Sequence, residues 1–252
     1  ANWRSSCTSV LHGMRCSEER KVMSETERIR RRYMERDASQ ALSGFWTLTN
    51  PVVLHLAQER ERIAIASLSQ RPDLNLGEAR ILDVGCGAGA EFANYLRWGA
   101  SIDNLVGIDL MLPRLREARR RYKATVVNAS GAALPFVDAC FDLVSQNVVF
   151  SSIIDAGMRV QVAQEMLRVL RPGGVVLWYD AFRTRSRDPD FRSVPMDEVQ
   201  QLFPDISFKW QHLTTDLGLL RRIHAAFGVQ AMSLVDQLSI FKTHLLGVGI
   251  KP

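Results

Sequence analysis

Apolar and polar positions along this chain follow two different periods. Residues 24–36 are expected to form a helix, because Ser24 and Glu27 have the spacing of a capping box. A second helix is predicted for residues 51–70, where Pro51 opens a segment with apolar side chains at helical spacing. From residue 81 onward, short apolar runs are separated by helical segments, so the pattern changes there to alternating strands and helices.

This alternating region predicts five strands and three helices. The strands are expected at residues 81–85, 104–110, 124–128, 141–146 and 175–181, and the helices at residues 91–98, 113–122 and 155–170. Strands that alternate with helices form right-handed crossovers and a buried parallel sheet. The predicted fold class is therefore α/β with a doubly wound sheet.

The alternation ends after residue 181. A polar loop is expected at residues 184–192, and a short helix and a strand are expected to follow it at residues 196–202 and 206–213. Residues 217–241 are predicted to be mostly helical around Gly228, and residues 243–251 to form a last strand.

The composition is that of a globular protein without a membrane span. The chain has 252 residues, of which 46% are hydrophobic and 23% charged, and this fits one large α/β domain or one domain with a cap. A largely disordered or collagen-like chain is excluded. No apolar run approaches the roughly 20 residues that a transmembrane helix needs. The net charge of +5 permits an anionic substrate or nucleic acid but demands neither.

The cysteines and the N-terminal segment indicate the cellular compartment in which the protein is expected. Cys7, Cys16, Cys86 and Cys140 have the spacing of neither a zinc site nor a disulfide framework, so we expect no metal and reduced thiols in a cytoplasmic protein. Residues 1–22 lack the apolar core of a secretory signal. We expect them to be a disordered or non-native leader.

The candidate chemistry centres on a glycine-rich turn. Asp83, Gly85, Gly87 and Gly89 follow an apolar strand and precede a helix. Glycines let the backbone approach a ligand closely, and the helix N-terminus adds free N–H groups. Asp109 ends the next strand, where its carboxylate is placed to accept both hydroxyls of a ribose. The pattern therefore predicts a nucleoside-containing cofactor.

The glycine-rich turn alone does not identify the cofactor. The spacing Gly85-x-Gly87-x-x-Ala90 also fits a dinucleotide fingerprint, which would make the chain an NAD(P)-linked oxidoreductase. Asp83 argues against this alternative, because a carboxylate suits a cationic amino group better than a pyrophosphate. Three downstream segments bear on the choice: LPF at residues 134–136, FDLV at 141–144 and LRVLRPGGVVLW at 167–178.

This ordered set of motifs resembles the class I S-adenosylmethionine-dependent methyltransferases, over residues 80–181 and more loosely over the last strand. The resemblance implies S-adenosylmethionine as cofactor, S-adenosylhomocysteine as product, and a Rossmann-like fold of seven mostly parallel strands with the last antiparallel. It further implies a helical N-terminal lid at residues 23–72 and a methyltransferase domain at 73–252, with a substrate cap around 183–241. A narrower similarity, in residues 145–155, 170–180 and 242–252, is to bacterial methyltransferases encoded beside natural-product or surface-glycan genes.

The resemblance also implies which residues contact the cofactor. The methionine end would lie at the glycine turn, the ribose at Asp109 and the adenine near the two residues that follow it. Ser130 stands where many relatives have an acid for the adenine amino group, and either its hydroxyl or a backbone group of Gly131 or Ala132 would replace it. Gln146 either lines the methionine portion or caps its strand. The full set is Asp83, Gly85, Cys86, Gly87, Asp109, Leu110, Met111, Ser130, Gly131, Ala132 and Gln146.

Polar side chains at the carboxyl end of the fifth strand are the candidates for catalysis. An acceptor binds outside the carboxyl ends of the strands in an open α/β sheet. Tyr179 and Asp180 are therefore best placed, with Asp180 as a candidate general base. Arg183 could hold an anionic group or pair with Asp180. Tyr33, Phe45 and Trp46 could close over the cofactor or pack the core of the lid.

These observations predict methyl transfer to a small molecule, with a hydroxyl of a sugar or secondary metabolite as the acceptor. The alternatives are an RNA methyltransferase, the oxidoreductase named above and a catalytically silent cofactor-binding subunit. No nucleic-acid partner is expected, since no RNA-binding appendage is found. The sequence leaves the oligomeric state open, a homodimer included.

Overall fold

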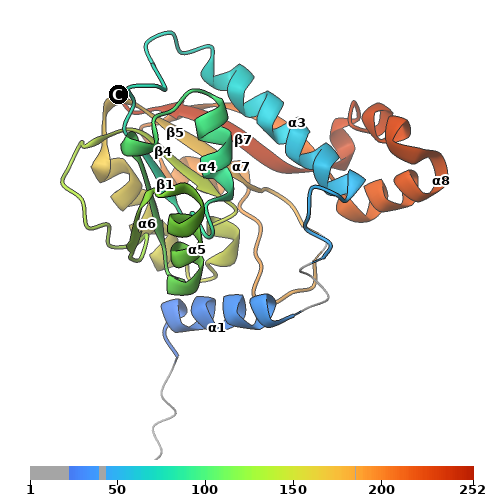
Figure 1. Ribbon diagram of the computed structural model, residues 1–252, viewed down its shortest axis with the longest axis horizontal. Coiled ribbons are helices and arrows are strands. Elements are labelled where there is room, and N and C mark those ends of the chain that lie inside the picture. Colours follow the sequence, from blue (N-terminus) through green and yellow to red (C-terminus); the bar gives the residue numbers. More distant parts are fainter. Residues whose placement is uncertain (1–22, 40–43, 185) are drawn as a thin grey trace, which may run out of the picture.

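A seven-stranded sheet forms the centre of the molecule (Figure 1). The computed structural model describes residues 23–39, 44–184 and 186–252. The strand order is β3-β2-β1-β4-β5-β7-β6, and β7 alone runs antiparallel to its neighbours among the described strands. This confirms the predicted fold class. The strands are β1 (Ile81–Val84), β2 (Leu105–Asp109), β3 (Thr125–Asn128), β4 (Phe141–Asn147), β5 (Leu170–Ala181), β6 (Ser207–Thr215) and β7 (Lys242–Ile250).

Helices cover both faces of the sheet. On one face, α6 (Ala156–Val169) and α7 (Met196–Leu202) bury their apolar sides against β1, β4 and β5. On the other face lie α3 (Pro51–Leu68), α4 (Ala90–Arg97) and α5 (Leu112–Tyr122). β1 and β4 are buried at nearly every residue, as expected of central parallel strands.

Two further helices lie outside these layers. α1 (Glu25–Ala38) lies apart from the helices that cover the faces, below the sheet in Figure 1, and α8 (Leu217–Val235) projects to the side beside α3. Ser24 accepts from the backbone N–H of Glu27 and donates its own N–H to the Glu27 carboxylate, which confirms the capping box. Short 3₁₀ turns occur at Ile102–Asn104, Phe150–Ser152 (η2) and Ser239–Phe241.

Two element boundaries differ from the sequence prediction by more than two residues: the start of β5 and the end of α8. Leu170 pairs with Phe141 ahead of a register shift, so it begins β5 and α6 ends at Val169. The helix expected over residues 217–241 is wrong beyond residue 235. Gly228 takes φ 75° and ψ −173°, which kinks α8, and Asp236 then ends the helix because its carboxylate bonds back to Thr215 and Lys242.

The leader expected at residues 1–22 lies outside the described residues, and its nature stays a prediction. Among the helices that the structure describes, none is long and apolar enough to cross a membrane.

Candidate active site

The glycine turn after β1 adopts a backbone that side chains would disturb. Gly85, Gly87 and Gly89 have φ values of 74°, 54° and 81°, in the left-handed region that favours glycine. A Cβ on Gly85 would lie 2.5 Å from Cγ2 of Val149. The turn therefore brings backbone close to the segment after β4 and leads directly into α4, which begins without a side-chain cap.

Asp109 fixes this turn from the end of β2. Its Oδ2 accepts a hydrogen bond from the N–H of Gly87 at 2.9 Å, and its Oδ1 accepts from the N–H of Met111 at 2.7 Å. Burial raises the pKa of Asp109, and the two backbone donors oppose that shift. Each carboxylate oxygen has a second lone pair, so the residue can also accept hydroxyls of a ligand in the pocket that it lines.

The pocket at Asp109, called the main pocket here, is partly open to solvent and has mostly apolar walls. Gly85, Leu110, Met111 and Gly131 line it among the residues expected to contact the cofactor. Sequence reasoning missed its other wall, which comes from the segment after β4 and from α6, because apolar residues there look like ordinary core. These missed residues are Val149, Ser152, Ile153, Met158 and Val162.

Six of the eleven expected contact residues do not line the main pocket, and two of these six, Asp83 and Gln146, line a second space instead. Ala129 takes the place expected for Ser130, whose Oγ accepts from the N–H of Ala132 within a local turn. Ala132 itself is also outside the lining, as are Gly87 and the buried Cys86. The adenine contact expected at Ser130 therefore does not follow from its side-chain geometry.

α1 covers the main pocket. Ile29 and Tyr33 of α1 line it, and the Tyr33 hydroxyl lies 2.9 Å from Oγ of Ser152. The guanidinium of Arg114 lies 4.5 Å from the centroid of the Tyr33 ring. Phe45 and Trp46 pack edge-to-face on each other and do not line this pocket, so of the three aromatic residues expected at the lid only Tyr33 reaches it.

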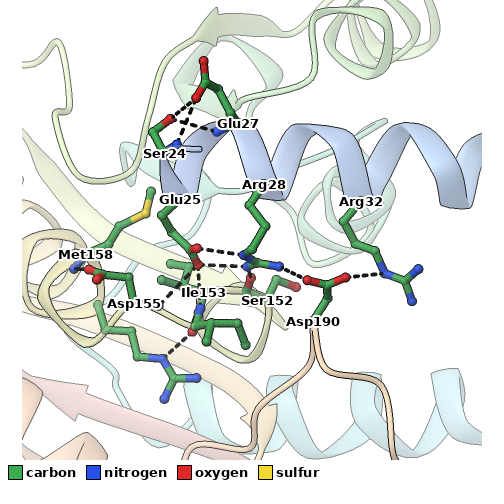
Figure 2. A network of polar contacts seen from close by, with 12 residues as sticks. Ser24, Glu25, Glu27, Arg28, Arg32, Ser152, Ile153, Asp155, Met158 and Asp190 are labelled. Carbon is green, nitrogen blue, oxygen red and sulfur yellow. Dashed lines mark hydrogen bonds and ion pairs between the residues drawn. The ribbon is translucent and has the colours of Figure 1, made fainter. Parts of the chain in front are cut away.

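A polar network holds α1 in this position (Figure 2). Arg28 donates to Glu25, to Oδ1 of Asp190 at 2.6 Å and to the carbonyl of Ser152 at 2.6 Å. Glu25 in turn accepts from the N–H of Ile154 at 2.6 Å, and Arg32 pairs with Asp188. α1 is thereby fastened both to the segment after β4 and to the loop after β5.

A second, smaller space adjoins the first. This polar cavity lies between α3, α4 and the ends of β1, β4 and β5, and Asn147 lines both spaces. Arg60, Asp83 and Glu91 face into it. Burial, with the nearby Glu91 carboxylate, raises the pKa of Asp83 to about 8.

Gln146 lies at the edge of the polar cavity, and both ends of its amide are already bonded. Its Nε2 donates to the carbonyl of Tyr179 at 3.2 Å, and its Oε1 accepts from the N–H of Val149 at 3.0 Å. Of the two roles weighed for Gln146, this geometry favours the polar strand cap. The residue still shapes the site, since it fixes the segment that supplies Val149 to the main pocket.

Neither catalytic candidate on β5 is free to act on an acceptor. Asp180 is fully buried; its carboxylate accepts from the N–H groups of Ser151 and Ala181, and burial raises its pKa to about 6. The Tyr179 hydroxyl bonds to Thr214 at 2.7 Å, and burial raises its pKa to about 12. The expectation of a general base at Asp180 is therefore corrected to a buried carboxylate that holds the Ser151 segment.

Arg183 does not pair with Asp180. Its guanidinium donates instead to the backbone carbonyls of Lys242 and Ile240. The described residues hold no group of three or more His, Cys, Asp or Glu side chains that could bind a metal ion.

The glycine turn, the carboxylate at the end of β2 and the sheet order together fit S-adenosylmethionine. Residues 82–178 match the family model of the methyltransferase domain. These residues form a class I S-adenosylmethionine-dependent methyltransferase domain. S-adenosylmethionine is the cofactor of this family, and S-adenosylhomocysteine the product.

Two curated relatives are methyltransferases of small molecules or carrier-bound groups. The chain is 34% identical to a malonyl-[acyl-carrier protein] O-methyltransferase of Enterobacter lignolyticus, over 68% of this chain and 64% of the relative. It is 31% identical to a demethylmenaquinone methyltransferase of Roseiflexus castenholzii, over 61% of this chain and 62% of the relative. The chain thus spans less than two thirds of the length of these curated relatives.

Solved structures support the same fold. The geranyl diphosphate C-methyltransferase of Streptomyces coelicolor superposes with a TM-score of 0.64 over 92% of this chain and 99% of that one, at 13% identity. The [4+2]-cyclase SpnF superposes with a TM-score of 0.56 over 77% of this chain and 82% of that one, at 19% identity. At these identities the likeness concerns the fold alone.

Proposed function

We propose that this protein transfers the methyl group of S-adenosylmethionine to a small-molecule acceptor. The observation that carries the proposal is the acidic surround of the glycine turn. Asp83 and Glu91 face one side of it, and Asp109 binds the turn itself. A pyrophosphate would add negative charge beside these carboxyl groups and make their ionisation still more costly, whereas the positive sulfonium and ammonium of S-adenosylmethionine favour the ionised form of Asp83. This supports the methyltransferase over the NAD(P)-linked alternative.

When bound, S-adenosylmethionine supplies an electrophilic methyl group, and the protein orients the two reactants and excludes water. Asp109 would hold the ribose hydroxyls, and the apolar wall from Leu110 to Met111 would contact the adenine. Tyr33 and Ile29 of α1 would close the pocket over the cofactor. A lid that covers the cofactor in this way favours a small acceptor over RNA.

A hydroxyl of a sugar or secondary metabolite is the acceptor that we propose. It is in keeping with the narrower resemblance of residues 145–155, 170–180 and 242–252. Attack by the hydroxyl oxygen forms a C–O bond and breaks the C–S bond, and the hydroxyl proton must leave. Because Asp180 and Tyr179 are bonded inside the protein, this proton would pass to water or to a base on the acceptor.

A carboxylate acceptor is the second candidate, and the hydrogen bonds that hold Asp180 and Tyr179 within the protein favour it as well. An acceptor that is already anionic needs no general base, and neither Asp180 nor Tyr179 is free to serve as one. One curated relative bears the name of an O-methyltransferase of a malonyl group. The two candidates differ in product: a hydroxyl gives a methyl ether and a carboxylate gives a methyl ester.

The test is a transfer assay with methyl-labelled S-adenosylmethionine and four acceptor classes: sugars, phenols, carboxylic acids and bulk RNA. Label should appear in a small molecule and resist mild alkali, since ethers survive conditions that release methanol from esters. Alkali-labile label would replace the hydroxyl with the carboxylate. Label recovered only in RNA, or no binding of S-adenosylhomocysteine, would overturn the proposal.

A further inference from the structure

Exposed apolar side chains gather at one end of the molecule, where α8 lies beside the start of α3 (Figure 1). More than half of the large apolar residues exposed in the described part of the chain lie in residues 44–58 and 217–241, which make up less than a fifth of it. They are Trp46, Leu48, Leu54, Phe227, Val229, Leu234, Leu238 and Ile240, called the α8 surface here. Exposed apolar patches mark surfaces that contact another molecule or a membrane.

Packing joins the two segments into one unit. Val52 on α3 is buried with Leu220 and Met232 on α8, and the guanidinium of Arg221 lies 5.3 Å from the centroid of the Phe45 ring. The apolar side chains that remain exposed around this small core are therefore fixed on a folded support.

The bend in α8 carries two of these side chains. Gly228 has φ 75° within the helix, and the residues on either side of it, Phe227 and Val229, are both exposed. Phe227 is 75% exposed, and α8 projects to the side of the sheet (Figure 1). An aromatic ring left in water costs solvation free energy, which contact with an apolar phase would recover.

The charge beside these apolar side chains is positive. In residues 44–58 and 217–241 the charged side chains are Arg221, Arg222 and Asp236. Asp236 is engaged within the protein, because its carboxylate accepts from Thr215 and Lys242. Both arginines are exposed, and Arg222 forms no hydrogen bond or ion pair within the residues that the structure describes. Two cations therefore lie on the α8 surface, and these segments supply no free acid to balance them.

We propose that the α8 surface binds the surface of a lipid bilayer that carries anionic head groups. Apolar side chains would enter the boundary between head groups and acyl chains, while the arginines stay with the lipid phosphates. Arg222 and Ile240 line one open hollow, so a phosphate and an acyl chain can contact them together. A second copy of this chain is a poorer occupant, because a symmetric pair would bring two sets of arginines together without acids to pair them.

Sedimentation of the full chain with vesicles tests the proposal. The protein should bind vesicles of equal parts phosphatidylglycerol and phosphatidylcholine, bind pure phosphatidylcholine more weakly, and lose affinity as salt rises. Phe227→Ser should weaken binding to the anionic vesicles about tenfold or more, since it removes a large apolar side chain from the contact. Trp46→Ser, on the other segment, should weaken it as well. Val137→Ser is the matched control, because Val137 is 74% exposed and lies outside the α8 surface.

The contribution of charge is tested separately. Arg221→Gln combined with Arg222→Gln should weaken binding to the anionic vesicles about tenfold and change binding to pure phosphatidylcholine little. Arg116→Gln combined with Arg119→Gln removes the same charge from the exposed side of α5 and should weaken binding far less.

Two results would overturn the proposal directly: no binding of the parent protein to the anionic vesicles, or equal binding by Phe227→Ser and Val137→Ser. Sedimentation equilibrium without lipid tests the other occupant, since a dimer that Phe227→Ser dissociates would assign the α8 surface to a second copy instead. Matching thermal unfolding of the variants excludes misfolding as the cause of weaker binding. None of these measurements needs cofactor or acceptor, so they test this surface independently of the proposed function.

Discussion

Arg28 on α1 and Asp190 after β5 form an ion pair at 2.6 Å, although 162 residues separate them in the sequence. The arginine is 14% exposed and also donates to the carbonyl of Ser152, which lines the main pocket. One guanidinium therefore joins the lid to two segments that follow neighbouring strands. The pair should stabilise the position of α1 more than an exposed surface ion pair would, because it is partly buried and shares a network of charged hydrogen bonds.

Arg28→Gln should loosen the lid. Loss of its charged hydrogen bonds should cost the closed position about 1–2 kcal/mol, which raises the dissociation rate of S-adenosylhomocysteine roughly 5–30-fold. Stopped-flow displacement measures this rate. Arg31→Gln on the same helix is the control, since Arg31 is 59% exposed and lies 3.8 Å from its partner Glu35. Equal rates in the two variants would show that α1 does not limit release.

Asp109→Ala should impair cofactor binding with little effect on the overall fold. The variant loses a charged acceptor for the ribose and the bond to the N–H of Gly87, a loss of about 1.5–3 kcal/mol in binding free energy. Calorimetry with S-adenosylhomocysteine should therefore show affinity reduced about tenfold or more. Asp103→Asn, an exposed acid just before β2, should bind normally. Unchanged affinity in Asp109→Ala would mean that another group holds the ribose.

Gly107→Ala should destabilise the protein next to the glycine turn. A Cβ on Gly107 would lie 2.5 Å from Sγ of Cys86 and 2.6 Å from Cζ of Phe92, so the core beneath the turn would be overpacked. Such changes cost about 1–3 kcal/mol, or roughly 2–12 °C in melting temperature. Gly77→Ala is the control, because its nearest contacts are 3.4 Å. Calorimetric scans of both variants test the difference; equal melting temperatures would contradict it.

The fold could be predicted from the sequence because its signals are local. The apolar runs of β1 and β4 and the glycines of the turn each report directly on backbone conformation or burial. A motif placed Asp109 at the end of β2, and the structure places it in the wall of the main pocket, while its contact with a ribose stays a prediction. Arg60 could not be found this way, because helical spacing tells which residues share a face and not what that face covers. For the same reason the sequence named three aromatic residues for the lid and did not single out Tyr33 as the one that lines the pocket.

The error at Asp180 has a similar cause. Its position at the carboxyl end of β5 predicts a place near the acceptor, but the direction of the side chain depends on how the segment around Ser151 folds back. That segment donates its N–H to the carboxylate and encloses it. The kink at Gly228 was missed because an isolated glycine within an apolar helical pattern is compatible with both a continuous and a broken helix.

Binding of the cofactor product should depend on pH through Asp83. Burial and the carboxylates of Glu91 and Asp109 raise its pKa to about 8, while the Ser145 hydrogen bond and Arg60 act in the opposite direction. Asp83 is therefore protonated in the free protein near neutral pH, and a cationic ammonium beside it favours the ionised form. Binding must then release a proton, so the affinity should rise with pH up to about 8, by at most tenfold per pH unit, and level off above it.

Titration calorimetry with S-adenosylhomocysteine from pH 6 to 8, repeated in buffers of different ionisation enthalpy, measures both the slope and the released proton. Asp83→Asn should bind more weakly and without this slope, because its amide does not titrate. Methylthioadenosine, which lacks the ammonium group, should show no slope with the parent protein. A slope that persists in Asp83→Asn would assign the proton to another group, with Asp109 the first to test, since burial also raises its pKa.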